Sequence, residues 1–201
     1  MSFIHRFEPG TKDRPTILLL HGTGGNETDL IPFARGIAPA SNLLSPRGQV
    51  LENGLPRFFR RLAAGVFDLE DLKFRAGELL EFIRISAAKY HFDPKSVIAI
   101  GYSNGANIAA ALLLLYERSL AGAILFRPMM PLVPEKIPDL SPCKILVAVG
   151  EHDVLIDPAK ASELITFLES AQAKVTIHRH PGGHELGRDD FAAAERWLSG
   201  W

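Results

Sequence analysis

The stretch Val97-Ile98-Ala99-Ile100-Gly101-Tyr102-Ser103-Asn104-Gly105-Ala106 decides the fold of this chain. Its first four residues are apolar, as in a buried strand, and the run from Ala106 to Leu115 favours a helix that is apolar on nearly every side. Between them, Gly-x-Ser-x-Gly predicts a sharp turn that strains the backbone of Ser103 and exposes its hydroxyl above a sheet. The alternative is an ordinary strand-to-helix turn with an idle serine. If a base lies within reach, Ser103 is a nucleophile.

Strands and helices alternate on both sides of this stretch. Apolar runs predict strands at 3–7, 16–20, 42–45, 97–100, 123–126, 145–149 and 175–178, and amphipathic or capped runs predict helices at 27–38, 68–90, from 104 onward, 157–171 and 188–199. Residues 47–67 are expected to form a long irregular loop. Such alternation predicts one α/β domain over residues 1–201, with a mostly parallel sheet of about seven strands covered by helices on both faces.

Composition narrows the class of protein. The chain has 201 residues, is 47% hydrophobic and 22% charged, and has a formal net charge of −1. That balance suits one globular core and gives no field that would attract nucleic acid. The longest apolar run has about ten residues, where a membrane span needs about 20. The N-terminus has no signal-peptide pattern, so a cytoplasmic location is expected. The sequence leaves open whether the protein forms a homodimer.

Two reactive residues follow later strands, where the sites of parallel sheets gather. Asp153 follows the strand at 145–149 and is the candidate that orients a histidine. Glu151 lies closer to the strand end and is a rival. Asp157 precedes Pro158 and is explained as a helix N-cap.

The candidate base is His184, in a glycine-rich loop after the strand at 175–178. The glycines leave the loop free to bring the imidazole to Ser103. His178 and His180 are the competitors, and a His-x-His pair also raises the alternative of a metal site. Since no acid or cysteine cluster accompanies the pair in the sequence, no metal is expected.

The oxyanion of an acyl-transfer reaction needs backbone N–H donors near the serine. One is expected from Asn104, at the start of the helix. The other is expected from Thr23, in the loop His21-Gly22-Thr23-Gly24-Gly25 that follows a buried strand. This loop lacks the Gly-Lys-Ser/Thr and Gly-x-Gly-x-x-Gly patterns of nucleotide sites, so nucleotide binding is rejected.

Five further residues are candidates for contact with the substrate. Arg47 and Arg127 each follow a strand and could bind an anionic group, although a salt bridge or a solvated loop position is the favoured explanation for each of them. Phe58 and Phe59 could line an acyl pocket or anchor the long loop. Met129 follows the strand at 123–126 and belongs to the same group of candidates.

Four motifs together resemble a known family, the carboxylesterase/phospholipase branch of the α/β hydrolases, which includes acyl-protein thioesterases. Two other segments resemble small bacterial carboxylesterases that are induced by methylhydroquinone. The four motifs are His21-Gly-Thr-Gly-Gly25, Gly101-Tyr-Ser-Asn-Gly105, Gly150-Glu-His-Asp153 and Gly183-His184, and the two segments are Ser45-Pro-Arg-Gly48 and Phe126-Arg-Pro-Met-Met-Pro131. Family members often carry Gln at the position of Asn104.

The resemblance implies an α/β-hydrolase fold without a cap domain. It also implies a serine carboxylesterase that acts on small carboxylic esters, with no cofactor, through Ser103, Asp153 and His184, which occur in the order of the fold. A lysophospholipase or an acyl thioesterase of the same fold is an alternative. A non-catalytic ligand-binding member of the fold is a second one, from a different class.

Overall fold

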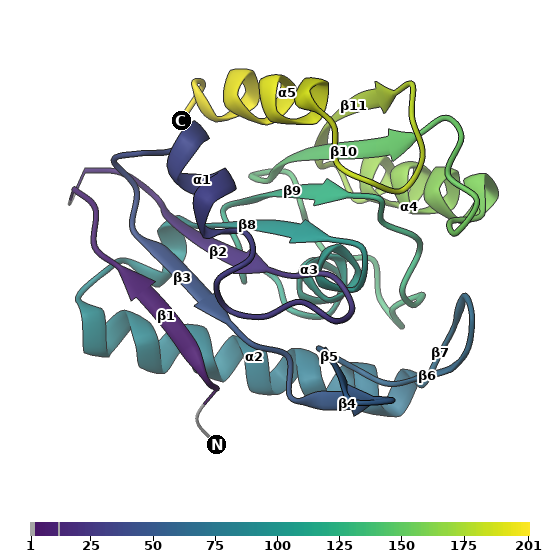
Figure 1. Ribbon diagram of the computed structural model, residues 1–201, viewed down its shortest axis with the longest axis horizontal. Helices are drawn as coiled ribbons and strands as arrows, with labels where there is room; N and C mark the ends of the chain where they lie inside the picture. Colours follow the sequence, from purple (N-terminus) through teal and green to yellow (C-terminus); the bar gives the residue numbers. More distant parts are fainter. Residues whose placement is uncertain (1–2, 12) are drawn as a thin grey trace.

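Seven strands form the central sheet of the computed structural model, which describes residues 3–11 and 13–201. They are β1 (His5–Glu8), β2 (Thr16–Leu20), β3 (Leu43–Pro46), β8 (Val97–Tyr102), β9 (Gly122–Phe126), β10 (Lys144–Gly150) and β11 (Lys174–His180). Their order is β1-β3-β2-β8-β9-β10-β11 (Figure 1). β1 is antiparallel to β3 at one edge, and all the other pairs are parallel. The mostly parallel sheet predicted from the sequence is confirmed.

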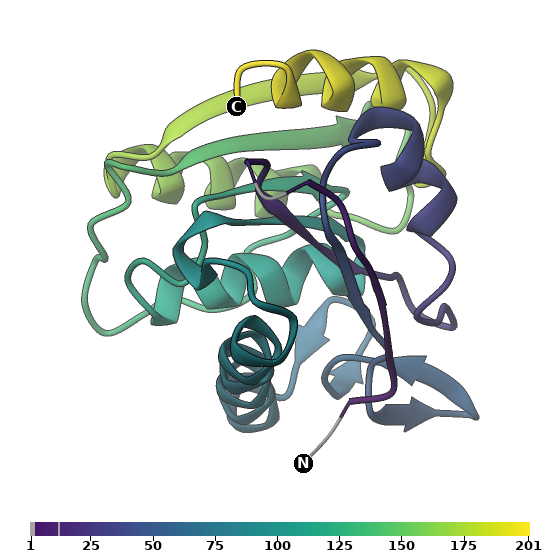
Figure 2. The same ribbon diagram turned by 90° about the vertical axis from the view of Figure 1, so that its left-hand side faces the viewer.

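Helices cover both faces of this sheet, as Figure 2 shows. The helices are α1 (Ile31–Ile37), α2 (Leu69–Tyr90), α3 (Asn104–Leu115), α4 (Pro158–Ser170) and α5 (Arg188–Leu198), with a short 3-10 helix η1 (Pro94–Ser96) before β8. α1 and α5 pack on one face, and α2, α3 and α4 pack on the other. The apolar helix after Ser103 is therefore central and buried, as its sequence predicts.

The burial of β2 explains why the central strands read as continuous apolar runs. All five of its residues are buried. Ile17 and Leu19 pack with α1 and α5, whereas Leu18 and Leu20 pack with α2 and α3. Successive side chains of a strand point to opposite faces, so a sheet covered on both sides needs apolar residues at every position.

Two predictions of local structure were wrong. Residues 47–67 are not irregular: they form two small hairpins, from β4 (Val50–Glu52) with β5 (Leu55–Arg57), and from β6 (Arg61–Ala63) with β7 (Val66–Phe67). Strands of two or three residues are too short to leave a periodic pattern. The first helix begins at Ile31 instead of residue 27, because Asn26 caps a turn by accepting hydrogen bonds from the Thr28 amide and hydroxyl.

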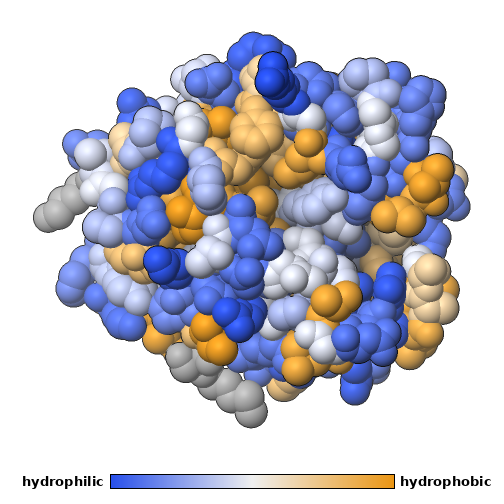
Figure 3. Space-filling model, viewed as in Figure 1, coloured by the Kyte–Doolittle hydropathy of each residue, from blue (hydrophilic) through white to orange (hydrophobic). Residues whose placement is uncertain are grey.

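The surface is mixed in character. On the face shown in Figure 3, hydrophobic residues occur in small groups among hydrophilic ones. Within residues 3–11 and 13–201, every helix is too short or too polar to cross a bilayer.

Candidate active site

The turn between β8 and α3 places Ser103 at the carboxyl end of the central strands. Ser103 has φ 53° and ψ −113°, a left-handed conformation that L-residues rarely adopt. Its N–H donates to the Phe126 carbonyl at 2.9 Å. A Cβ at Gly105 would collide with the Leu20 carbonyl, and one at Gly101 would lie 2.5 Å from the Gly105 oxygen. Both glycines are therefore required by backbone that passes close to them.

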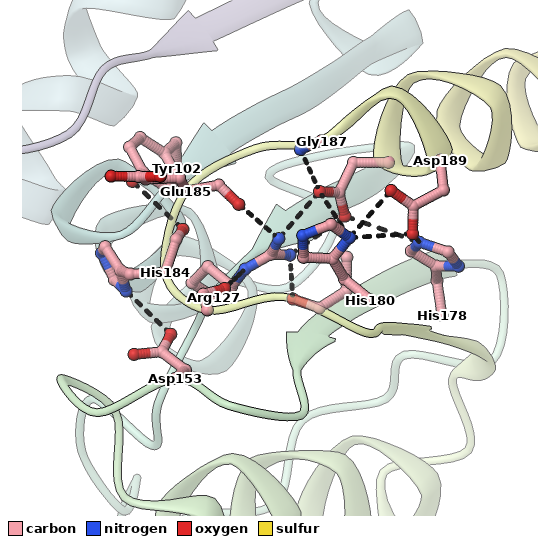
Figure 4. Close-up of polar contacts among 12 residues, drawn as sticks. Tyr102, Arg127, Asp153, His178, His180, His184, Glu185, Gly187 and Asp189 are labelled. Atoms are coloured by element: carbon pink, nitrogen blue, oxygen red, sulfur yellow. Dashed lines mark hydrogen bonds and ion pairs between the residues drawn. The ribbon is translucent and has the colours of Figure 1, made fainter.

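Ser103, His184 and Asp153 form a chain of hydrogen bonds. His184 Nε2 lies 3.0 Å from Ser103 Oγ, and His184 Nδ1 lies 2.8 Å from Asp153 Oδ2 (the second contact is drawn in Figure 4). The other carboxylate oxygen of Asp153 accepts from the N–H groups of Leu155 and Ile156, at 2.8 and 3.1 Å. The Asp153 side chain is only 3% exposed. The carboxylate is thus fixed, and it can orient the imidazole with Nε2 toward the serine.

The rivals of these residues lie elsewhere. Asp157 caps α4 through a hydrogen bond from the Ala159 N–H at 2.9 Å. Glu151 is exposed. His178 and His180 project from β11 toward the start of α5, where each lies near Asp189 (Figure 4).

Arg127 holds the segment that carries His184. Its guanidinium donates to the carbonyls of Gly183 and Glu185, at 3.0 and 2.8 Å, on either side of His184. The same group pairs with Asp190 at 2.7 Å, and both side chains are completely buried. Arg127 was a candidate for binding an anionic substrate, but the structure places it behind the site, where it fixes the histidine loop. Its partner is distant in sequence, so no local pattern could reveal this role.

His21 links two loops around the site and was missed as a functional residue. Its Nε2 lies 2.9 Å from the Gly48 N–H, which can only donate, so Nε2 accepts. The ring proton must then be on Nδ1, which donates to the Gly22 carbonyl at 2.6 Å. Burial lowers the pKa of His21, in agreement with this neutral form. The sequence feature that could have indicated this role is the position of His21 directly after a buried strand.

The two candidate oxyanion donors, Thr23 and Asn104, both line the pocket beside Ser103. Among the described residues, the Thr23 and Asn104 N–H groups have no hydrogen-bond acceptor, whereas the Gly24 N–H donates to the Pro56 carbonyl and the Gly25 N–H to Gly22. The Asn104 side chain has a separate role, because its Oδ1 accepts from the Phe58 N–H at 2.7 Å. It thereby holds the 47–67 segment against the start of α3.

The aromatic and sulfur candidates divide between core and pocket. Phe58 and Phe59 are 2% and 0% exposed and belong to the hydrophobic core, so they anchor the 47–67 segment. Met129 lines the pocket beside Ser103, and its N–H donates to Asn107 Oδ1 at 2.9 Å.

The pocket beside Ser103 and His184 has a volume of about 290 Å³. Its wall combines apolar groups with two guanidinium groups, and includes Thr23, Arg57, Arg61, Phe67, Met129 and Ile156. Arg57 donates to Thr23 Oγ1 at 2.7 Å. Both arginines contact Glu52, at 3.3 Å from Arg57 and 2.6 Å from Arg61, and the hydrogen bond from Arg61 lowers the pKa of Glu52. Two cations and one anion leave this wall with a net positive charge.

Arg47, the other arginine suggested by the sequence, does not line this pocket. It forms a two-pronged ion pair with Glu27, at 2.5 and 2.8 Å. The hydrogen bond from Arg47 lowers the pKa of Glu27. The sequence assigns no role to Arg57 and Arg61, because strands as short as those of the two hairpins leave no periodic pattern.

Comparisons with known proteins agree with this architecture. Residues 70–194 match the model of the dienelactone hydrolase family. The chain is 45% identical over 193 residues to the putative hydrolase MhqD of Bacillus subtilis, covering 96% of each protein. A Bacillus cereus carboxylesterase superimposes with a TM-score of 0.95 and 47% identity, over 97% of this chain and 92% of that one. YahD, solved with malic acid, gives a TM-score of 0.93 and 32% identity, over 97% of each. This chain belongs to the dienelactone hydrolase family of α/β hydrolases and is an ester hydrolase.

Proposed function

We propose that this protein is a serine carboxylesterase in which Ser103, His184 and Asp153 act as a catalytic triad. The observation that carries the proposal is the continuous chain of contacts from Asp153 through His184 to Ser103, at 2.8 and 3.0 Å, beside a pocket. The strained backbone of Ser103 adds support, because such strain persists only where the surrounding structure enforces it, and residues of this kind cluster at active sites.

The first half of the reaction forms an acyl-enzyme. Ser103 Oγ attacks the ester carbonyl while His184 Nε2 takes its proton. Asp153 keeps the other ring proton on Nδ1 and stabilises the imidazolium that forms. The carbonyl oxygen gains negative charge in the tetrahedral intermediate, and the unpaired N–H groups of Thr23 and Asn104 stabilise it there. When the intermediate collapses, His184 returns the proton to the departing alcohol.

The second half repeats these roles with water. His184 removes a proton from a water molecule, and the water oxygen attacks the acyl carbon. The same two N–H groups stabilise the second oxyanion, and Ser103 leaves as a neutral hydroxyl after it regains a proton from His184.

The pocket favours a small substrate. Its volume of about 290 Å³ lies just below the range for small-molecule sites, roughly 300–1,000 Å³. Its net positive wall at Arg57 and Arg61 further favours esters that carry a carboxylate. The structural neighbour YahD was solved with a dicarboxylic acid, malic acid. We therefore assign small esters with an anionic substituent as the preferred class.

A fluorophosphonate probe followed by kinetics tests the proposal. The probe should label wild-type protein at one residue, Ser103, and Ser103→Ala should abolish labelling and lower kcat by about 10⁴-fold or more. Ser103→Ala with near-normal turnover, or a wild-type protein that no probe labels, would contradict the triad. A panel of oxygen esters, thioesters and lysophospholipids of matched acyl length then separates the carboxylesterase from its alternatives by kcat/KM.

A further inference from the structure

Two histidines and two aspartates meet between β11 and α5, outside the proposed catalytic triad. His178 and His180 project from the same face of β11, because side chains two residues apart in a strand do so. Asp189 and Asp190 lie in the first turn of α5. Ligand atoms of His178, His180 and Asp190 all lie within 4.8 Å of one another. The sequence separates these residues, and only the fold supplies the acids that the histidine pair lacked.

The distances from His178 Nε2 to the two aspartates are close to the edge of a small coordination sphere. His178 Nε2 lies 3.4 Å from Asp189 Oδ2 and 3.6 Å from Asp190 Oδ1. A tetrahedral Zn²⁺ with bonds of about 2.0–2.1 Å keeps its ligand atoms about 3.3–3.4 Å apart. His180 Nδ1 also contacts Asp189 at 2.8 Å, a hydrogen bond that a cation would replace.

One potential ligand atom in this group, His178 Nε2, has no hydrogen-bond partner among the described residues. His178 Nε2 is buried and makes no hydrogen bond to any residue in 3–11 or 13–201. An imidazole nitrogen that is buried among carboxylates normally finds a partner. It faces oxygens of both Asp189 and Asp190, a position from which it could coordinate a cation together with them.

Asp190 retains capacity for a metal although it already binds Arg127. Its Oδ2 accepts from Arg127 and from the Gly187 N–H, at 2.7 and 2.8 Å. Within the described part of the chain, its Oδ1 accepts only from Arg127, at 3.0 Å. A carboxylate oxygen has about two lone-pair directions, so Oδ1, the oxygen nearer His178, can bind a cation while the ion pair stays intact. Two carboxylates against one guanidinium also leave the group negative when both histidines are neutral.

The His180 ring is held in position by two glycines. A Cβ at Gly182 would collide with His180 Nε2, and a Cβ at Gly187 would collide with its Cε1. The imidazole therefore occupies a slot that only glycines at both positions leave open. This preorganisation keeps Nδ1 directed at Asp189 and Asp190, as Figure 4 shows for His180 and Asp189.

We propose that His178, His180, Asp190 and Asp189 form a binding site for a divalent transition-metal ion of the Zn²⁺ type. Two imidazole nitrogens with carboxylate oxygens favour Zn²⁺, Co²⁺ or Ni²⁺ over Mg²⁺ and Ca²⁺, which prefer oxygen ligands. The ion joins the end of β11 to the start of α5, across the base of the segment that carries His184. Its role is structural, because Arg127 lies between it and the Gly183 and Glu185 carbonyls that flank His184.

Metal titration of tag-free, chelator-treated protein tests this site. Zn²⁺ is followed by calorimetry, and Co²⁺ by the visible absorption that reports a tetrahedral site. The wild type should bind one ion, and saturating Zn²⁺ should raise Tm by about 5 °C. His178→Gln is the sharpest variant, because it removes a ring nitrogen that makes no hydrogen bond to any of the residues the structure describes. Both His178→Gln and His180→Gln should weaken binding by at least about tenfold.

The control is His91→Asn, at the exposed end of α2, where Asn tolerates the left-handed backbone. It should bind Zn²⁺ like the wild type. Circular dichroism and Tm without metal verify that each variant is folded. Should one variant fail to fold, the other tests the site. A wild type without saturable binding, or binding that His178→Gln, His180→Gln and His91→Asn leave equally strong, overturns the proposal.

Discussion

Replacement of Asp153 by Asn tests the proposed triad most directly, because the structure dictates how the new amide must point. Asp153 Oδ1 accepts from two backbone N–H groups, those of Leu155 and Ile156. An Asn side chain keeps its carbonyl oxygen there, since the opposite orientation would leave these donors facing an NH₂ group at a cost of about 1–3 kcal/mol each. The NH₂ group must then face His184 Nδ1, which lies 2.8 Å from the present Oδ2.

The consequence is the wrong tautomer of His184. Nδ1 becomes an acceptor, so the ring proton moves to Nε2, which can no longer accept the proton of Ser103. We expect kcat for p-nitrophenyl acetate to fall by about 10⁴-fold, which is about 5.4 kcal/mol of activation free energy. The fold should survive, because both backbone donors stay satisfied, and Tm and circular dichroism report this.

Asp157→Asn is the matched control, with the same chemical change in the same loop. Asp157 caps α4 through a hydrogen bond from the Ala159 N–H, and Asn caps a helix as well as Asp does, so stability should change by less than about 0.5 kcal/mol. Its kcat should match the wild type. A folded Asp153→Asn enzyme within tenfold of wild-type kcat, or an Asp157→Asn enzyme that is the more damaged, would refute the reasoning.

Four further predictions follow from the same structure. Gly105→Ala should lower the free energy of unfolding by at least about 1–3 kcal/mol, because the added Cβ would collide with the Leu20 backbone. Gly36→Ala lies in open space on α1 and should raise the free energy of unfolding by about 0.4–1 kcal/mol. Urea melts measure both changes, and equal effects would contradict the steric argument. The pKa of His21 is lowered in the folded protein, so as pH falls the unfolded chain, whose histidine has its ordinary pKa near 6.5, takes up the proton first. Stability should therefore fall below about pH 6.5, by up to about 1.4 kcal/mol per pH unit. His21→Gln should make this pH dependence of stability shallower. Arg61→Gln should raise KM for a carboxylate-bearing ester more than for a neutral ester of equal size; equal changes would remove the charge preference. Among neutral aryl esters, kcat/KM should peak at about two to four acyl carbons, because each further CH₂ gains about 0.8 kcal/mol only while apolar wall covers it; an optimum at palmitoyl length would indicate a lysophospholipase or thioesterase.

The sequence by itself determined the strand, turn and helix around Ser103, because every requirement there is local. Apolar β8 residues, two obligatory glycines and an apolar helix act within one continuous stretch, and backbone sterics at Gly101 and Gly105 leave little choice. The candidates Asp153 and His184 were reachable for a similar reason, since parallel strands place the loops that follow them at one edge of the sheet.

Tertiary structure alone decided which polar groups meet away from that edge. Arg127 and Asp190 are 63 residues apart and pair only because α5 packs against β10 and β11. Burial without a partner would be too costly for either charge. The same packing brings the first turn of α5 to His178 and His180. In the 47–67 segment, short hairpins turn Phe58 and Phe59 into the core and Arg57 and Arg61 toward the pocket. Such choices depend on which surfaces are left to bury once the sheet has formed, and that information is absent from any local pattern.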